Sequence, residues 1–295
     1  MDDSSVEREI SAGENLEAWF TKNGRDLPWR RDRNPWAVLV SEMMLQQTQV
    51  ERVVSRWPRF LRRFPNPTAM AARPVAEVID EWAGLGYNRR AVNLHRCASA
   101  IVERFDGVVP SSPDDLQSLP GIGPYTARAV AVFAFESQEA VVDTNVARIL
   151  ARVHNRALSG GEAQRLADQW ARGRDPWVWN QALIDVGALF CRPGHAACEL
   201  CPLHERCRWR AVRTSAPDPA VGSAGVSGRQ SKFEGSDRQG RGRLVKALRR
   251  CEVAAGDLAS TMGWPEDPER AERVAGTLLA DGLVELVDGR YQLPG

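Results

Sequence analysis

Lysine is almost missing from this chain of 295 residues. Only Lys22, Lys232 and Lys246 occur, so residues 23–231 contain no lysine amine at all. A covalent mechanism through a Schiff base needs such an amine, and its absence excludes a lysine nucleophile over most of the chain. Long apolar runs are missing too, because no stretch approaches the roughly 18 residues that a membrane-spanning helix requires.

The chain also lacks a charge excess and a disulfide framework. With 39 Lys and Arg against 38 Asp and Glu, the net charge of +1 does not by itself indicate a nucleic-acid binder. The N-terminus, Met-Asp-Asp-Ser-Ser, lacks the basic and then apolar pattern of a signal peptide. Outside one cluster the only cysteines are Cys97 and Cys251, so we expect a protein of the reducing cytoplasm.

What the sequence does contain, up to about residue 210, is a series of short helical patterns. Apolar residues recur at spacings of three and four, and strand-like alternation is almost absent before residue 212. The pattern predicts an all-α fold made of many short helices. Helices are expected over residues 75–82, 91–105, 125–135 and 146–153.

The C-terminal part has a different character. Residues 213–239 are rich in Gly, Ser, Pro and Asp and predict a flexible linker. Residues 240–295 predict a winged-helix-like module that binds nucleic acid, binds a partner or caps the core. Its expected elements are helices near 242–250, 253–262 and 268–281 and a hairpin that turns at Asp288-Gly289.

Four cysteines in a turn-rich stretch are spaced Cys-x6-Cys-x2-Cys-x5-Cys. Thiolates gathered this closely suit a soft metal. Zinc modules usually have two Cys-x2-Cys pairs and only one is present here, whereas iron–sulfur clusters are held by four cysteines at varied spacings. We therefore favour a [4Fe-4S] cluster over two disulfides or plain buried thiols. The expected ligands are Cys191, Cys198, Cys201 and Cys207.

A second motif lies in residues 112–126. Ser112 before a proline and two acidic residues predicts a helix start, and Leu119-Pro-Gly-Ile-Gly predicts a tight turn before the next helix. Gly121 and Gly123 let the backbone approach a ligand, while the new helix offers unpaired N–H groups to an anion. The segment looks like a helix-hairpin-helix that grips a DNA phosphate, and an ordinary helix corner is the alternative.

Two carboxylates stand out. Glu42 lies on a predicted helix whose face is otherwise apolar, where desolvation raises the pKa of a carboxyl group and makes it a candidate general acid. A buried salt bridge to an arginine is the alternative. Asp143 follows the apolar run Ala140-Val-Val and precedes a helix. It is either an N-cap or an ionised carboxylate that stabilises a positive charge on a sugar.

Taken in order, the Leu-Pro-Gly-Ile-Gly turn, Asp143 and the four cysteines resemble the helix-hairpin-helix DNA glycosylase superfamily, which is endonuclease III-like. Within it, Leu27-Pro-Trp-Arg, residues 41–50, Gly84-Leu-Gly-Tyr and Val142-Asp-Thr-Asn-Val resemble the MutY-type adenine glycosylases. The resemblance covers about residues 14–210. It implies two helical subdomains with an iron–sulfur loop at 191–207, together forming a glycosylase domain over residues 1–212.

The resemblance implies a monofunctional enzyme of base excision repair. It would act as a monomer on double-stranded DNA, and hydrolyse the N-glycosidic bond of adenine opposite 8-oxoguanine or guanine. Glu42 would protonate adenine and Asp143 would stabilise the oxocarbenium ion, in parallel with glycoside hydrolysis. Tyr125 replaces the lysine of strand-cleaving relatives and, with Asn145, supports this site. The positions implied for DNA or the extruded base are Arg30, Gln47, Thr48, Tyr87, Gly121, Gly123 and Asp185.

Gln47 and Tyr87 would fill the gap left by the flipped base, and Arg30 and Asp185 would face it. Two features depart from the family pattern. Asp185 stands where glutamate is usual, and residues 240–295 are too few for the Nudix-like domain that helps many adenine glycosylases recognise 8-oxoguanine. The alternatives are a mismatch thymine or uracil glycosylase and a non-catalytic iron–sulfur DNA-binding regulator.

Overall fold

The structure, a computed structural model, describes residues 16–224 and 232–295. The chain forms two compact units, each assembled from two separate stretches. Of the described residues, 16–33 and 124–224 form the first unit, and 34–123 and 232–295 form the second. Within the predicted linker at 213–239, residues 225–231 lie outside the described residues.

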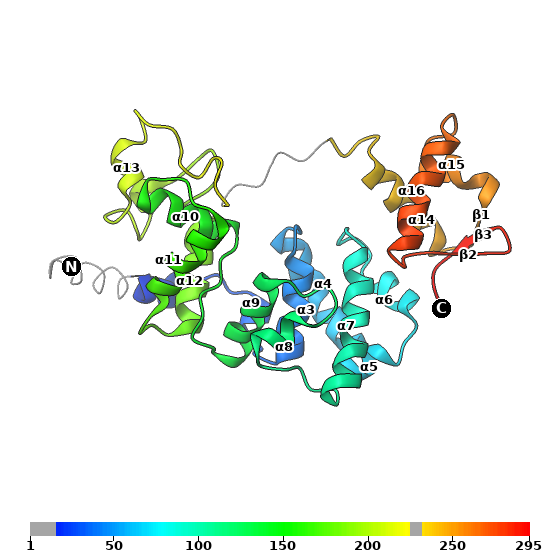
Figure 1. Ribbon diagram of the computed structural model, residues 1–295, viewed down its shortest axis with the longest axis horizontal. Coiled ribbons are helices and arrows are strands. Elements are labelled where there is room, and N and C mark those ends of the chain that lie inside the picture. The colour runs from blue at the N-terminus through cyan, green and yellow to red at the C-terminus, as the bar shows by residue number, and fades with distance from the viewer. Residues whose placement is uncertain (1–15, 225–231) are drawn as a thin grey trace. The chain divides into compact units, whose positions relative to one another are not determined.

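Helices form the first unit, with α10 in its middle. α10 packs against α11, α12 and α13 (Figure 1). Leu150 of α10 and Trp179 and Leu183 of α12 are at most 1% exposed and form part of its core. Residues 16–23 are helical, and the elements that follow are α2 (Pro28–Arg31), α9 (Pro124–Phe135), α10 (Thr144–His154), α11 (Gly160–Ala171), α12 (Pro176–Leu189), the 3-10 helix η1 (Cys198–Leu200) and α13 (Arg208–Val212).

Polar caps fix where these helices begin. Asp143 caps α10, Asp175 caps α12, and Ser159 forms a capping box with Glu162 at the start of α11. In each case a short side chain accepts a hydrogen bond from an N–H group that the first helical turn leaves unpaired. The local sequence therefore sets the starting points of the helices that carry the site.

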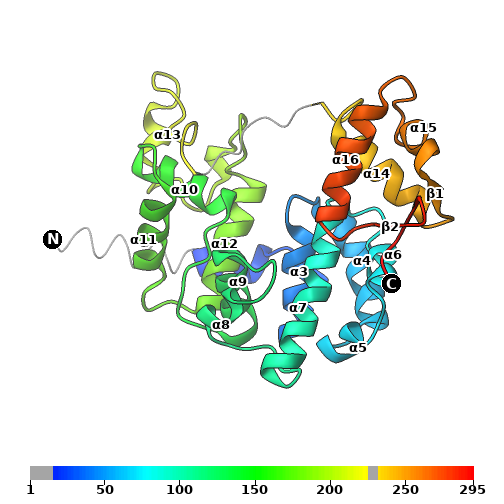
Figure 2. The ribbon, with the colours of Figure 1, turned by 45° about the vertical axis from the view of Figure 1, so that its right-hand side comes forward.

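The first stretch of the second unit forms six helices, and α7 is the longest of them. α7 packs against α3, α5 and α6 (Figure 2). Trp36 of α3 donates from its indole N–H to the carbonyl oxygen of Phe64 at 2.9 Å, and Trp57 of α4 donates likewise to Ala37 at 2.9 Å. These buried bonds fix α3 against α4. The six helices are α3 (Pro35–Leu45), α4 (Val50–Arg63), α5 (Pro67–Ala71), α6 (Val75–Glu81), α7 (Arg89–Phe105) and α8 (Pro113–Gln117).

The C-terminal module has the order helix, strand, helix, helix, hairpin, which is that of a winged helix and confirms the predicted type. Its antiparallel sheet has the order β1-β3-β2, with Val253 opposite Tyr291. Asp288 and Gly289 both have positive φ, as a tight hairpin turn requires. The elements are α14 (Asp237–Leu248), β1 (Val253–Ala254), the 3-10 helix η2 (Ala255–Asp257), α15 (Leu258–Met262), α16 (Pro268–Ala280), β2 (Glu285–Val287) and β3 (Arg290–Gln292).

The predicted all-α class is confirmed for the glycosylase part, and the four expected helices there begin and end within two residues of α6, α7, α9 and α10. The helix predicted over 253–262 is wrong for its first two residues, whereas 255–257 form a 3-10 helix and 258–262 an α-helix. Val253 and Ala254 form strand β1, because the buried Val253 side chain pairs across the sheet with Tyr291. None of the described helices is long and apolar enough to cross a membrane.

Candidate active site and cysteine pocket

Asp143 lies at the junction between the loop after α9 and the start of α10. One carboxylate oxygen accepts a hydrogen bond from Val146 N at 2.8 Å, and the other accepts from Asn145 Nδ2 at 2.7 Å. Burial raises the pKa of the Asp143 carboxyl above its ordinary range, and these two hydrogen bonds oppose the rise. Asp143 is therefore the N-cap of α10 and also a desolvated carboxylate held by the side chain of Asn145.

Asn145 and Arg148 connect Asp143 to the cysteine loop. Asn145 Oδ1 accepts from Arg148 Nη2 at 2.7 Å. The same guanidinium donates through Nη2 to the carbonyl oxygen of Gly187 at 3.0 Å and through Nε to that of Cys191 at 2.6 Å. A continuous chain of hydrogen bonds thus runs from the Asp143 carboxylate to the backbone of a cysteine. The sequence did not predict this role of Arg148, because α10 also carries Arg152 and no local pattern distinguishes the two arginines.

The predicted turn between α8 and α9 is present. Ile122 N donates to the carbonyl oxygen of Leu119 at 3.2 Å. Gly121 has a φ of 78°, and an added Cβ would lie 2.7 Å from Asn93 Cβ, so both conformation and space require glycine. Gly123 is exposed and precedes the first turn of α9, whose N–H groups have no helical partners. Tyr125 is half-buried in that turn.

Arg30 and Asp185 form a buried pair in the first unit. Arg30 donates from Nη1 and Nη2 to the two oxygens of Asp185 at 2.9 and 2.7 Å. Arg25 occupies the same carboxylate through its backbone N–H at 2.8 Å and its Nε at 2.7 Å. These cations hold the pKa of Asp185 below its usual range although burial opposes this, and Asp185 is 0% exposed. Both of its oxygens are thus taken by arginines.

Glu42 belongs to the second unit, whereas Asp143, Asn145, Tyr125 and the Arg30–Asp185 pair belong to the first. Glu42 lies in α3 and is 5% exposed. Its helix neighbours Ser41 and Met43 are buried as well. The predicted burial of this carboxyl on an apolar helix is confirmed.

Gln47, Thr48 and Tyr87 come from two turns that the second unit brings together. Gln47 follows α3 and Tyr87 precedes α7, and both are exposed. The hydroxyl of Thr48 donates to the carbonyl oxygen of Leu85 at 3.2 Å and so connects the two turns. Arg90, which no sequence motif marked as functional, contacts both turns.

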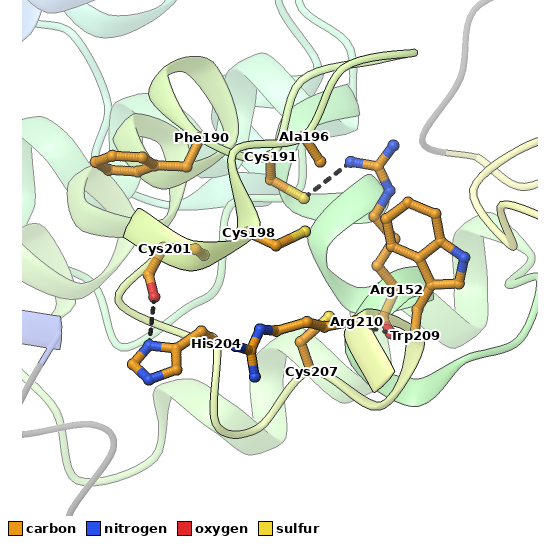
Figure 3. A pocket seen from close by; sticks show the side chains of 10 residues that line it. All are labelled: Arg152, Phe190, Cys191, Ala196, Cys198, Cys201, His204, Cys207, Trp209 and Arg210. Carbon is orange, nitrogen blue, oxygen red and sulfur yellow. Dashed lines mark hydrogen bonds between the residues drawn. The ribbon is translucent and has the colours of Figure 1, made fainter. Parts of the chain in front are cut away.

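The four predicted cysteine ligands line one pocket of the first unit (Figure 3). The pocket has a volume of about 280 Å³, part of it open to solvent. Arg152 Nη1 lies 3.2 Å from Cys191 Sγ, and Trp209 packs beneath the Arg152 guanidinium with 4.6 Å between the guanidinium carbon and the ring centre. A cation placed beside the sulfurs favours the negative thiolate form that metal ligation requires.

In the described part of the chain, the four cysteines are not arranged as ligands of one metal ion. Among the described residues, no group of three or more His, Cys, Asp or Glu is placed to hold one ion. A zinc site needs all four sulfurs about 2.3 Å from one point. Burial raises the pKa of Cys201 to about 12, so without a metal its thiol stays protonated near neutral pH.

Comparisons with known proteins agree with this fold. Residues 40–171 match the HhH-GPD superfamily base excision DNA repair protein family. A thermostable thymine-DNA glycosylase has a similar structure, with a TM-score of 0.64 and 26% identity over 71% of this chain and 99% of that one. Endonuclease III bound to DNA has a TM-score of 0.63 at 23% identity, over 73% of this chain and 100% of that one. Fold and motifs together define a helix-hairpin-helix DNA glycosylase.

Curated relatives narrow the family. The adenine DNA glycosylase of Mycobacterium tuberculosis H37Rv is 43% identical, over 95% of this chain and 93% of the relative. That of Mycolicibacterium smegmatis is 42% identical over 95% of each chain. This chain therefore belongs to the adenine DNA glycosylase family, hydrolases of N-glycosyl bonds in base excision repair.

The alignments differ in whether they include the C-terminal module. The human adenine DNA glycosylase is 39% identical over only 66% of this chain and 38% of its own length. The mycobacterial alignments cover 95% of this chain, so they include most of the winged-helix module. The module is thus shared with these bacterial relatives.

Proposed function

We propose that this protein hydrolyses the N-glycosidic bond of adenine opposite 8-oxoguanine or guanine in double-stranded DNA and leaves the strand uncut. The observation that carries the proposal is the Asp143 carboxylate, held at the start of α10 by Val146 and Asn145. It occurs in a chain that is 43% identical over nearly its whole length to an adenine DNA glycosylase.

In the proposed reaction, Glu42 donates the proton that makes adenine a good leaving group. Its buried position suits a general acid, and such a group contributes about 10²–10⁴ in rate. Asp143 supplies the negative charge that stabilises the sugar as the bond to adenine breaks, directly or through a transient adduct. Water then gives its hydroxyl to the sugar, and its remaining proton restores Glu42.

Asn145 orients Asp143 in this scheme, because its amide donates to the carboxylate while Arg148 holds the amide from behind. Tyr125 occupies the position at which strand-cleaving relatives carry a lysine. With no lysine in residues 23–231, this part of the chain has no amine to attack the sugar. Borohydride should therefore trap no covalent complex through residues 23–231.

Arg30 is the proposed contact to the extruded adenine. Its Nη1 and Nη2 donate to Asp185, whereas its Nε is buried and has no hydrogen-bond partner within the described ranges. Because this Nε is enclosed, Arg30 has to shift before the atom can donate to a ring nitrogen of adenine, and the unmade hydrogen bond lowers the cost of that shift. Asp185 then acts by orienting Arg30, since its own oxygens are already engaged.

Reaching the base requires extrusion from the duplex. We propose that Gln47 and Tyr87, both exposed on their turns, fill the gap that the adenine leaves, and that Thr48 lies beside the opposite base. The turn at Gly121 and Gly123 would hold a phosphate through the N–H groups at the start of α9.

For the cofactor we propose a [4Fe-4S] cluster on Cys191, Cys198, Cys201 and Cys207. When bound, the cluster supplies four iron–thiolate bonds that fix the loop over residues 191–207. That loop also carries Arg192, which is available to a DNA phosphate. An iron–sulfur cluster and the free thiols of Cys97 and Cys251 fit the reducing cytoplasm that we propose as the compartment.

The test uses duplexes with A opposite 8-oxoguanine, A opposite guanine, and T or U opposite guanine, followed by alkali to reveal abasic sites. Release from the two adenine duplexes only is the expected result. A mismatch thymine or uracil glycosylase is the second candidate, because the solved thymine-DNA glycosylase shares 26% identity with this chain. Release from the T or U duplexes would support it, and binding without any release would support a non-catalytic regulator.

A further inference from the structure

The two turns that carry the proposed inserting residues hold unusual backbone conformations. Gln47 has a φ of 53° and Tyr87 a φ of 46°. Few non-glycine residues adopt this left-handed region, and they persist there only where the surrounding structure fixes them. The turns therefore need a group that holds both.

A single buried cation contacts both turns. Arg90 lies in the first turn of α7 and is 7% exposed. Its Nη1 donates to three carbonyl oxygens at the end of α3 and in the turn after it, those of Met43 at 2.8 Å, Met44 at 2.8 Å and Gln46 at 2.6 Å. Its Nη2 donates to Thr48 Oγ1 at 2.8 Å and to the carbonyl oxygens of Leu85 at 3.3 Å and Gly86 at 3.0 Å.

The contacts of Arg90 satisfy carbonyl groups that the end of α3 leaves unpaired. The last carbonyl groups of α3 have no partner within the helix and carry its negative dipole end, which a guanidinium satisfies. The Arg90 guanidinium carbon also lies 5.3 Å from the ring centre of Trp82 and 5.6 Å from that of Tyr87. Burial lowers the pKa of Arg90 to about 10, which leaves it charged at neutral pH.

We propose that Arg90 is a positioning residue for base extrusion: its guanidinium fixes the two turns so that Gln47 and Tyr87 are already placed for insertion into the duplex. The inference rests on the proposed function, which gives these two side chains that role. Turns that are ordered beforehand need no ordering while the adenine leaves the stack. Lysine cannot replace Arg90, because a compact ammonium cannot reach acceptors on both turns in one plane.

The experiment compares the wild-type protein with Arg90→Lys in three measurements. The single-turnover release of adenine opposite guanine should fall by about 10–100-fold, as for a small misplacement of a site. With 2-aminopurine at the adenine position, the fluorescence rise on extrusion should weaken in parallel. The affinity for a duplex with a tetrahydrofuran abasic analogue should stay within about threefold, since no base has to leave the stack there.

A matched control and a double-mutant background test whether Arg90 acts through Gln47 and Tyr87. Arg62→Lys makes the same exchange at an exposed position of α4 and should leave all three measurements unchanged. In a Gln47→Ala, Tyr87→Ala background, Arg90→Lys should lower the rate by less than about threefold, because coupled residues are not additive. Effects that simply multiply would overturn the proposal, and so would an equal loss of affinity for the abasic duplex.

If Arg90→Lys does not fold, as judged by its melting curve, the variant Thr48→Val tests the role of Arg90 instead. This variant removes the hydroxyl that accepts from Arg90 Nη2 and donates to the carbonyl oxygen of Leu85. Base extrusion should weaken as in Arg90→Lys, but by a smaller factor. Full extrusion and full rate in Thr48→Val would then overturn the proposal. A wild-type protein that releases no adenine contradicts the proposed function itself. An active wild type with Arg90→Lys at full rate contradicts only the role of Arg90.

Discussion

The close approach of α12 to the start of α10 gives the sharpest prediction for the proposed active site. A Cβ added at Gly187 would lie 2.4 Å from Asn145 Cβ, 3.1 Å from its Cα and 3.2 Å from its carbonyl carbon. Packed carbon atoms approach to about 3.5–4.0 Å, so Gly187→Ala forces the start of α10 to retreat by roughly 1 Å. Two of the three atoms are backbone, and no rotamer change of Asn145 relieves the contact.

We predict that Gly187→Ala lowers the rate of adenine release by about 10²-fold, because Asn145 and Asp143 move together and a displacement of about 1 Å has that effect. Overpacking costs about 1–3 kcal/mol. Alanine regains about 1 kcal/mol over glycine in a helix interior. The net loss of up to about 2 kcal/mol corresponds to a melting temperature lower by roughly 4–8 °C at most.

The assay is single-turnover release from a duplex with A opposite guanine, together with thermal melts. Gly276→Ala is the matched control, because Gly276 lies inside α16 and an added Cβ there has no atom within 4 Å. It should melt slightly higher and keep the wild-type rate. A Gly187→Ala protein with full activity and a raised melting temperature would refute the claim that this contact holds Asn145 and Asp143 in place.

Five further predictions concern three side chains. Asp143→Asn keeps a good N-cap but loses the charge, so single-turnover release should fall by at least about 10²-fold, whereas Asp143→Ala should also lose about 1 kcal/mol of stability in thermal melts. Since burial raises the pKa of Asp143 in the folded state, the ionised carboxylate disfavours folding at neutral pH. Asp143→Asn should therefore melt no lower than wild type at pH 7. As the pH falls towards the raised pKa, the melting temperature of wild type should rise relative to that of Asp143→Asn. The same raised pKa places the acid limb of the pH–rate profile above the ordinary Asp range, a shift that a limb near pH 3.8 would contradict. Glu42→Gln should lower single-turnover release by at least about 10²-fold with unchanged DNA affinity, and a near-normal rate would remove Glu42 from its role. Cys201→Ser should lower the iron content and the melting temperature, and full iron in this variant would argue against the proposed ligand set.

Features fixed by neighbouring residues were predictable from the sequence. The cap at Asp143 and the turn at Gly121 depend on a few adjacent positions, because a short polar side chain satisfies its own helix start and a glycine supplies a positive φ. The spacing of the cysteines likewise predicted that all four would meet in one pocket.

Features that depend on packing between distant segments were not predictable. Arg90 and Arg148 look like ordinary helix arginines in the sequence, and only the folded chain shows that each donates to several carbonyl oxygens far away in the chain. Val253 was assigned to a helix because its strand partner Tyr291 lies 38 positions later, outside any local window. Resemblance placed Asp185 near the base, but it could not show that Arg25 would compete for the carboxylate.

The carboxylate that Arg25 and Arg30 share lies 160 and 155 positions further along the chain. A ribosome adds about 5–20 residues per second, so the N-terminal arginines wait roughly 8–30 s for Asp185 to be synthesised. During that interval the apolar side chains of Leu16 and Phe20 lack part of the core that buries them, since Trp179 and Leu183 of α12 belong to it. The nascent chain thus has an aggregation-prone stage that ends only when α12 leaves the exit tunnel, and chaperone demand should be greatest there.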